Sequence, residues 1–279
     1  MNFQNIPRDD KTIKRAIIPK LGALSFFDYS AIEPRLFGYY AAKMGHPDLA
    51  KMVNDGTDPY TAVAALVEQK DNISKDERQK WKVFFLSLMY GGGIKTIRKQ
   101  FGVDYAEAKR MVNQFHTNFP AVRALQDTVG RVSSRRGYIV GIDGRHLHPE
   151  PFGEHKMLNK LVQGGAAGIM KQAIVRVHRE LAGPNMHTGT GRPTAAELNA
   201  PPMLLVDRMR TPQSHIVSIV HDDLWIDGPV DEVLYLHNVV PRLMVHEEVN
   251  EVVPIEVDHE VTTTNAAEKQ PYDEWRHAV

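Results

Sequence analysis

The chain has 279 residues, no cysteine, and 34 basic side chains against 34 acidic ones. An apolar share of 42% excludes a disordered, collagenous or disulfide-stapled chain. No stretch of the sequence is long and apolar enough for a membrane span, and the first residues lack the apolar core of a signal peptide. We therefore expect a soluble, cytoplasmic protein with no membrane partner.

Charge is unevenly distributed along the chain. Residues 75–136 carry 13 basic and 5 acidic side chains, whereas residues 222–279 carry 3 basic and 14 acidic ones. A basic segment can follow a polyanion such as nucleic acid, and an acidic segment repels it. Two solvated surfaces would give the same counts, so charge alone leaves both interpretations open.

The first elements expected in chain order are a strand, a helix and then a group of helices. Apolar residues 24–27 predict a short strand, and residues 32–42 predict an amphipathic helix. The clearest helix start is Ser74, which can form a capping box with Glu77. Glycines 91–93 are expected to end that helix, because they lack the Lys-Ser/Thr that follows a phosphate-binding loop.

The remaining elements alternate between helices and hairpins. Helices are predicted from Asp104, from Asn118 and over residues 154–181, with an irregular Pro-rich loop at 183–211. Residues 138–148 predict a hairpin with a two-residue Asp143-Gly144 turn. A second tight hairpin at 216–226, a helix at 230–249 and a strand at 254–261 complete an α+β pattern with strands at both ends.

Three aspartates lie at the end of a predicted strand or in the turn between two predicted strands. Asp28 ends the first strand, and Asp222 and Asp223 lie at the tip of the second hairpin. Hard divalent cations prefer carboxylate oxygens, and carboxylates from separate strands can hold a pair of ions. Each aspartate taken alone is better explained as a common turn residue.

The helix that begins at Ser74 presents a repeated set of side chains at intervals of four. These are Arg78, Lys82, Leu86 and Tyr90. Such residues share one side of a helix, where cations can meet phosphates and a ring can meet a base. A solvated basic face over an aromatic core is the alternative that the helix alone favours.

Three segments together resemble the motifs of the polymerase domain of family A DNA polymerases, typified by bacterial DNA polymerase I. The first is Asp-Tyr-Ser-Ala-Ile-Glu-Pro-Arg at residues 28–35, the second is Arg78 with Lys82 and Tyr90, and the third is Val-His-Asp-Asp at residues 220–223. Weaker matches lie at residues 4–7, 143–145 and 163–164. The motifs occur in family order and spacing over essentially the whole chain, which makes the combination specific.

The resemblance implies a right-hand polymerase fold of the α+β class, without a thumb. A palm made of an antiparallel sheet with helices would occupy residues 1–35 and 154–279, with an inserted loop at 183–211. A helical fingers subdomain would occupy residues 36–153.

The implied activity is template-directed, DNA-dependent DNA synthesis, in which two Mg²⁺ ions assist nucleotidyl transfer to a primer 3′-hydroxyl. The residues implied in catalysis are Asp28, Asp222, Asp223 and Lys82, and the implied metal ligands are Asp28, the carbonyl of Tyr29, and Asp222. The implied nucleotide-binding residues are Tyr29, Ser30, Ala31, Glu33, Tyr60, Arg78, Lys82, Leu86 and Tyr90. Glu33 would exclude a ribose 2′-hydroxyl and pair with Tyr90. The implied DNA contacts are Arg35, Asn159, Gln163 and His221.

Several positions depart from the family pattern, namely Ala31, Pro34, Tyr60, Leu86 and Ser87, and two of them bear directly on nucleotide binding. Leu86 stands where an aromatic residue is usual, which reduces stacking on the incoming nucleotide. Tyr60 stands where a triphosphate-binding histidine is expected, and it offers a hydroxyl donor but no cation.

The resemblance also bears on partners. The family's thumb helices and exonuclease ordinarily precede the motif that begins here at Gln4, so we expect one part of a phage-type or split polymerase. Its partners would be primer-template DNA, a dNTP and a second polypeptide carrying thumb and exonuclease, in a bacterial or phage-infected cell. The alternatives are a catalytically weak subunit that binds primer-template or a replication partner, and a magnesium hydrolase that uses the same aspartates.

Overall fold

A computed structural model describes residues 11–70, 72–150, 156–182 and 212–278. The weak motif match at 4–7 and the expected loop at 183–211 lie outside these residues. The chain divides into two compact units, which are described separately. The first unit comprises residues 1–30, 169–245 and 256–279, and the second comprises residues 31–168 and 246–255. Among the helices that the structure describes, none has the length and apolarity needed to cross a bilayer.

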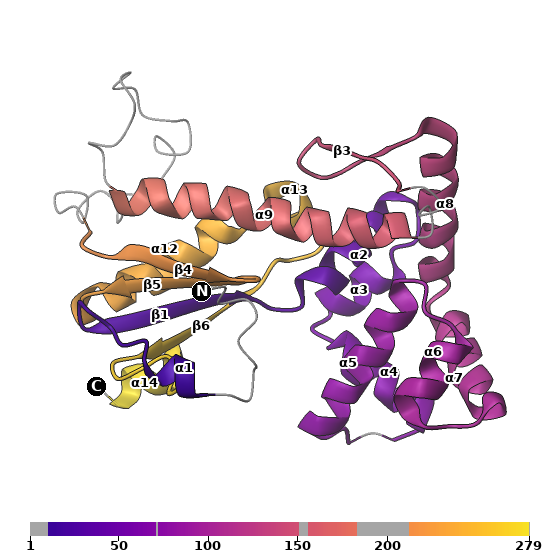
Figure 1. Ribbon diagram of the computed structural model, residues 1–279, viewed down its shortest axis with the longest axis horizontal. Helices are drawn as coiled ribbons and strands as arrows, with labels where there is room; N and C mark the ends of the chain where they lie inside the picture. The colour runs from indigo at the N-terminus through magenta and orange to yellow at the C-terminus, as the bar shows by residue number, and fades with distance from the viewer. Residues whose placement is uncertain (1–10, 71, 151–155, 183–211, 279) are drawn as a thin grey trace. The chain divides into compact units, whose positions relative to one another are not determined.

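The first unit is built on a five-stranded antiparallel sheet with the strand order β4-β5-β1-β6-β7 (Figure 1). The strands are β1 (Ala23–Tyr29), β4 (His215–Val220), β5 (Asp223–Gly228), β6 (Val257–Thr262) and β7 (Gln270–Pro271). Because β1 is the central strand and is covered on both faces, its sequence reads as a nearly continuous apolar run. The α+β class and the antiparallel sheet are confirmed.

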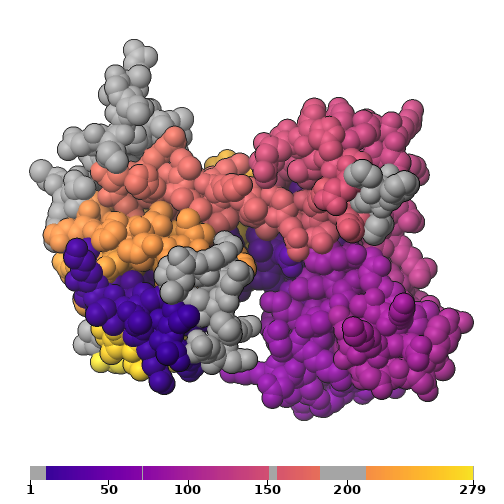
Figure 2. Space-filling model, in the orientation of Figure 1, coloured from indigo at the N-terminus to yellow at the C-terminus, as the bar shows by residue number. Residues whose placement is uncertain are grey.

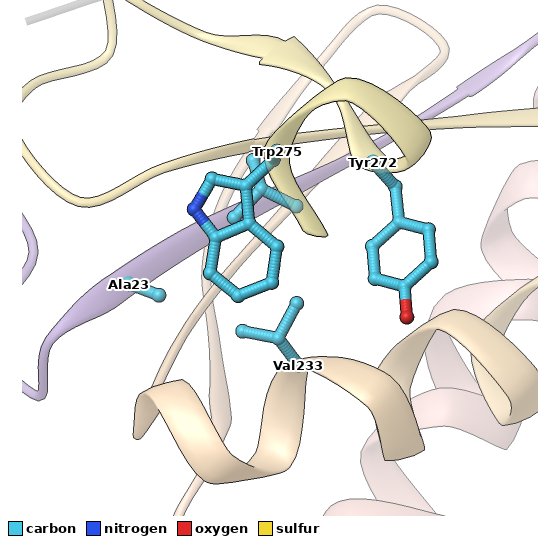
Figure 3. Close-up of a cluster of buried hydrophobic side chains, with 5 residues drawn as sticks. Ala23, Val233, Tyr272 and Trp275 are labelled. Atoms are coloured by element: carbon cyan, nitrogen blue, oxygen red, sulfur yellow. The ribbon is translucent and has the colours of Figure 1, made fainter. Parts of the chain in front are cut away.

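The two faces of β1 pack against different elements, because successive side chains of a strand point to opposite faces. On one face, Ala23 packs with Val233 of α12 (Val233–Met244) and with Tyr272 and Trp275 of α14 (Tyr272–Ala278), as Figure 3 shows. Val261 of β6 belongs to the same cluster. The other face carries the cluster Leu24, Phe26, Trp225 and Ala266. Asp28 has the same parity as Leu24 and Phe26, so its carboxylate lies on the face opposite α12 and α14.

The long helix α9 (Met157–Ala182) runs from the second unit into the first. In the first unit it is tied to α12, because Arg176 donates to the carbonyls of Leu243 (2.6 Å) and Val245 (3.0 Å). These are carbonyls at the end of α12 that have no partner within the helix. Residues 230–249, expected as one helix, therefore form η5 (Val230–Glu232), α12 and a separate α13 (Glu247–Asn250). The break falls at Val245, whose backbone is extended. The described part of the first unit also contains a short α1 (Lys11–Arg15).

Helices dominate the second unit, and those coloured purple pack closely in the space-filling view (Figure 2). In chain order they are α2 (Ile32–Lys43), α3 (Asp48–Asn54), α4 (Pro59–Glu68), α5 (Lys75–Met89), α6 (Ile94–Phe101), α7 (Tyr105–Asn118) and α8 (Pro120–Arg136), followed by the first part of α9 and by α13. The capping box is confirmed, because Glu77 N donates to Ser74 Oγ (3.3 Å) and Ser74 N donates to Glu77 Oε2 (2.8 Å). Buried rings of Trp81, Phe84, Phe85 and Phe115 form the core between α5 and α7.

The predicted hairpin at 138–148 exists, but the two-residue turn is wrong. Its strands β2 (Ile139–Val140) and β3 (His146–Leu147) pair Val140 with His146, so residues 141–145 all belong to the connection. Within it Gly141 N donates to the Arg145 carbonyl (2.8 Å), and Asp143 accepts from Arg145 N (3.2 Å). The Asp143-Gly144 pair therefore lies within a five-residue loop, which is closed by hydrogen bonds between its own residues.

A column of stacked rings lies beneath the central strand of the first unit. His259 stacks on Phe27 at a centroid separation of 4.2 Å, and His237 stacks on Tyr272 at 3.8 Å. The Nδ1 atoms of the two histidines lie 3.1 Å apart. Burial first, and then His237, lowers the pKa of His259 to about 3, so the buried ring stays neutral at physiological pH.

The contribution of His259 to stability should fall as the pH drops from about 7 to about 5. The unfolded chain protonates His259 near its ordinary pKa of 6.5, whereas the folded protein resists protonation down to about 3. This site contributes at most about 2 kcal/mol over that interval. Urea denaturation at both pH values should show that His259→Phe gains stability relative to the parent as the pH falls. The exposed control His277→Gln should show no such gain, and a stability difference between His259→Phe and the parent that does not change with pH would contradict this origin.

Candidate functional site

The structure brings the three predicted aspartates together in the first unit. Asp28 is the Cα partner of Asp223 across the β1–β5 pairing and of Asp258 across the β1–β6 pairing. Asp222 directly precedes Asp223 in the two-residue connection between β4 and β5. The other residue of that connection is His221, whose side chain is exposed and whose backbone is left-handed (φ 59°). The tight hairpin is therefore confirmed, and it carries Asp222 to the end of the central strand.

The carboxylates are crowded enough to change their own protonation. Burial first, and then Asp222 and Asp223, raises the pKa of Asp28 to about 7. Burial also raises the pKa of Asp223, and Lys269 partly offsets that effect. One oxygen of Asp28 and one of Asp223 are buried with no hydrogen-bond partner among the described residues. Unpartnered buried oxygens beside like charges form a site that favours a cation.

Lys269 is a site residue that sequence reasoning missed. Its ammonium lies 3.5 Å from Asp223 Oδ2, pairs with Glu260, and sits 4.9 Å from the ring centroid of Phe26. Burial lowers the pKa of Lys269, but Asp223 and Glu260 more than offset this, and the pKa is raised. The sequence offered one signal for Lys269, because it is one of only 3 basic side chains in the acidic segment 222–279.

The residues that follow Asp28 are held by the backbone and by nearby polar groups. Tyr29 is buried and its hydroxyl donates to the Met244 carbonyl (2.7 Å), so its side chain serves packing. Ser30 Oγ donates to Asp258 (2.8 Å). Ala31 adopts left-handed backbone (φ 54°), which is uncommon for a residue with a Cβ, and it is the N-cap of α2.

In the second unit, two cations gather around one buried ring. Tyr60 of α4 is 2% exposed, and its ring centroid lies 5.1 Å from Arg78 Cζ and 5.6 Å from Lys82 Nζ. Arg78 also pairs with Asp58, which sequence reasoning missed as a site residue. The signal was present, because Asp before Pro at a helix start is an N-cap pattern. Arg78 and Lys82 are one turn apart on α5, as their spacing predicted.

The rest of the predicted nucleotide group lies at the end of α5 and nearby. Burial, and then the nearby Glu33 carboxylate, raises the pKa of Tyr90, whereas Gln163 lowers it. Glu33 and Gln163 therefore both lie close to the Tyr90 hydroxyl. Leu86 is half-buried, and its carbonyl accepts the Tyr90 N–H (3.0 Å) at the end of the helix.

The predicted DNA contacts of the second unit differ in their surroundings. Gln163 is exposed on α9. Asn159 Oδ1, also on α9, is buried with no hydrogen-bond partner in the part of the chain that the structure describes. Arg35 is 7% exposed and its guanidinium donates to the Pro254 carbonyl. In this conformation Arg35 stabilises the fold, and its contact with DNA stays a prediction.

Comparison with known proteins decides the family. The model of DNA polymerase family A matches residues 1–267. The chain belongs to this family. It is 26% identical over 275 residues to DNA polymerase I of Streptococcus pneumoniae, an alignment that covers 92% of the chain and 28% of that protein. It is 30% identical over 180 residues to the DNA polymerase of Mycobacterium phage D29, covering 63% of the chain and 29% of that protein.

The fold of the family is also found in a solved structure. The POL domain of Pol1 from M. smegmatis, in complex with DNA primer-template and dNTP, matches with a TM-score of 0.72 at 23% sequence identity. That likeness covers 96% of this chain and 45% of the other. The right-hand polymerase class expected from the motifs is thereby confirmed. The chain spans less than a third of the length of the Streptococcus pneumoniae and Mycobacterium phage D29 polymerases.

Family A polymerases use divalent metal ions, and the carboxylate group has suitable donors. Asp28 and Asp222 provide hard oxygen ligands that Mg²⁺ prefers, and the unpartnered Asp28 oxygen is available to a cation. Across residues 11–70, 72–150, 156–182 and 212–278, no three His, Asp or Glu side chains converge as a metal-binding cluster. The fit therefore rests on the two carboxylates.

Removing the charge of Asp28 should stabilise the metal-free protein near neutral pH. The folded pKa of Asp28 is about 7 and the ordinary value is 3.8, so the folded protein loses stability as the pH rises through that window. Asp28→Asn should recover at most roughly 2 kcal/mol after allowance for solvent screening. Urea denaturation in EDTA measures this gain.

The exposed aspartate Asp127 on α8 supplies the matched control, because Asp127→Asn should leave stability nearly unchanged. Added Mg²⁺ should stabilise the parent protein more than Asp28→Asn. A less stable Asp28→Asn in EDTA would show that the carboxylate is not strained.

Proposed function

We propose that this chain is the palm and fingers portion of a DNA-dependent DNA polymerase. It would transfer a deoxynucleoside monophosphate from a dNTP to the 3′-hydroxyl of a primer on a DNA template. The observation that carries this proposal is that Asp28 pairs with Asp223 across the β1–β5 pairing, with Asp222 beside it in the connection between β4 and β5. Membership of the family supports it. Residues 1–35 and 154–279 would form the palm, and residues 36–153 the fingers.

The carboxylate group would hold two Mg²⁺ ions. Asp28 and Asp222 would be ligands together with the carbonyl of Tyr29, and Asp223 would be an accessory carboxylate. When bound, Mg²⁺ lowers the pKa of a coordinated hydroxyl and stabilises charge on a transferring phosphoryl group. Asp222 and Asp223 would supply the negative potential that recruits the ions, and they add to the larger effect of burial in raising the pKa of Asp28.

The cations around Tyr60 would bind the nucleotide. Arg78 and Lys82 would contact the triphosphate, and Lys82 would stabilise charge on the departing pyrophosphate. Tyr60 would offer its hydroxyl, and Leu86 would contact the sugar and base with less stacking than an aromatic ring. Tyr29, Ser30, Ala31, Glu33 and Tyr90 would complete the nucleotide site.

The DNA would be contacted by Asn159, Gln163 and His221 near the primer terminus. Arg35 would reach DNA only if its guanidinium released the Pro254 carbonyl. A second polypeptide with thumb and exonuclease remains a prediction, as does a cytoplasmic location. Primer extension with and without candidate partner proteins tests the former.

Extension of a labelled primer with deoxynucleotides and Mg²⁺ is the direct test of the activity. Asp28→Ala and Asp222→Ala should each lower the rate roughly 10³-fold or more, because ligand loss removes several kcal/mol of transition-state stabilisation. Asp127→Ala, which changes an exposed aspartate on α8, should extend like the parent.

The alternatives give different outcomes in the same assay. A parent protein that binds primer-template without extending it would indicate a polymerase-like subunit. Cleavage of DNA without nucleotides would indicate a hydrolase, and near-parental extension by both aspartate variants would refute the proposed roles of Asp28 and Asp222.

Sugar selection tests the role of Glu33, which lies near the Tyr90 hydroxyl. If its side chain occupies the space of a 2′-hydroxyl, Glu33→Ala should raise ribonucleotide incorporation relative to deoxyribonucleotide by roughly tenfold or more. Competition assays with both nucleotides measure the ratio, and Glu107→Ala on α7 is the control. An unchanged ratio would count against this role.

A further inference from the structure

Asp58 links the helix that carries Tyr60 to the helix that carries Arg78. It is the N-cap of α4, and its Oδ2 accepts from Thr61 N (2.9 Å) and Thr61 Oγ1 (2.6 Å). The same oxygen accepts from Arg78 Nε (3.0 Å), and Oδ1 accepts from Arg78 Nη2 (2.6 Å). Its carboxylate therefore holds the guanidinium at two points while it caps the helix.

This grip leaves one edge of the guanidinium available. Arginine has five N–H donors in a planar fork, and Asp58 engages one on Nε and one on Nη2. Among the described residues Arg78 makes no other hydrogen bond, so both N–H groups of Nη1 and one of Nη2 are left for a ligand. The Tyr60 ring, 5.1 Å from Arg78 Cζ, restrains the guanidinium from a second direction.

The charge of Asp58 has two opposed effects on a bound polyanion. Burial raises the pKa of Asp58, but the hydrogen bonds from Arg78 and Thr61 outweigh it and the pKa is lowered, so the carboxylate is ionised. Its negative charge weakens the attraction that Arg78 and Lys82 exert on phosphates. The two hydrogen bonds to Asp58 restrain the Arg78 side chain, which is 42% exposed, before a ligand binds. Binding therefore costs less side-chain conformational entropy.

We propose that Asp58 is a positioning residue for the binding of a nucleoside triphosphate. By holding the guanidinium, Asp58 presents the remaining N–H donors of Arg78 to the phosphate oxygens beside Lys82. The inference rests on the proposed function and deepens it. Positioning outweighs charge cancellation here, because the fork geometry aligns the remaining donors of Arg78 in one plane. Loss of the grip therefore weakens triphosphate binding although it makes the site more positive.

Two substitutions separate positioning from helix capping. Asp58→Asn and Asp58→Ser both retain a good N-cap residue, and both lose the charged fork to Arg78. Calorimetric titration of the whole chain with inorganic tripolyphosphate, and separately with dTTP, in Mg²⁺ should show roughly fivefold weaker binding for each variant. In primer extension the KM for dTTP should rise by the same factor, with kcat little changed.

The matched control is Glu107→Gln on α7. It breaks a second two-point pair in the same unit, in which Arg110 donates to Glu107 through Nε (2.9 Å) and Nη2 (2.7 Å). This variant should bind tripolyphosphate like the parent. A loss equal to that of Asp58→Asn would mean that any broken ion pair perturbs the unit, and would overturn the proposal.

A double-mutant cycle gives the decisive readout. In an Arg78→Ala background, Asp58→Asn should cause no further loss of tripolyphosphate affinity, because its effect acts through Arg78. An equal loss in that background, unchanged or tighter binding by Asp58→Asn alone, or no binding by the parent chain would each overturn the proposal. Binding that follows these expectations in a chain that fails to extend primers would support the inference and reject the proposed function instead.

Discussion

Burial of neighbouring carboxylates at the end of the central strand is the constraint on which the first unit depends. Burial and the charges of Asp222 and Asp223 make ionisation of Asp28 unfavourable, and its pKa rises to about 7. The fold sustains this strain because β1 is paired on both edges and covered on both faces. The hydrophobic clusters around Ala23 and Leu24 therefore hold in place a group of charges that would separate in a free chain.

Lys269 offsets the negative charge of Asp223 but does not pair with Asp28. Its ammonium is near Asp223 and Glu260, whereas Asp28 keeps an oxygen without a partner in the described part of the chain. A fully neutralised cluster would have little affinity for a divalent cation, and a cluster with no internal cation would destabilise the sheet further. The arrangement partly compensates the charge of Asp223 and leaves an oxygen of Asp28 available to a cation.

In the second unit the neighbouring charges are positive, because two cationic side chains lie close together. Arg78 and Lys82 lie around the Tyr60 ring, and Asp58 compensates one of the two charges. An aromatic ring accommodates cations through its negative face without adding a charge of its own. The ring is buried against Phe85, so its position is set by the core.

What the sequence by itself determined was set by short-range signals. The Ser74 capping box, the apolar run of β1 and the tight turn before Asp223 each depend on neighbours a few residues away, and the three motifs identified the family. Only the tertiary structure decided the five-residue β2–β3 connection and the break after α12. The latter coincides with hydrogen bonds from Arg176, which is distant in the chain. The sequence shows a lysine in an acidic segment and an Asp-Pro helix start, but it does not show the contact of Lys269 with Asp223 or of Asp58 with Arg78. Each contact joins segments that only strand pairing or helix packing brings together.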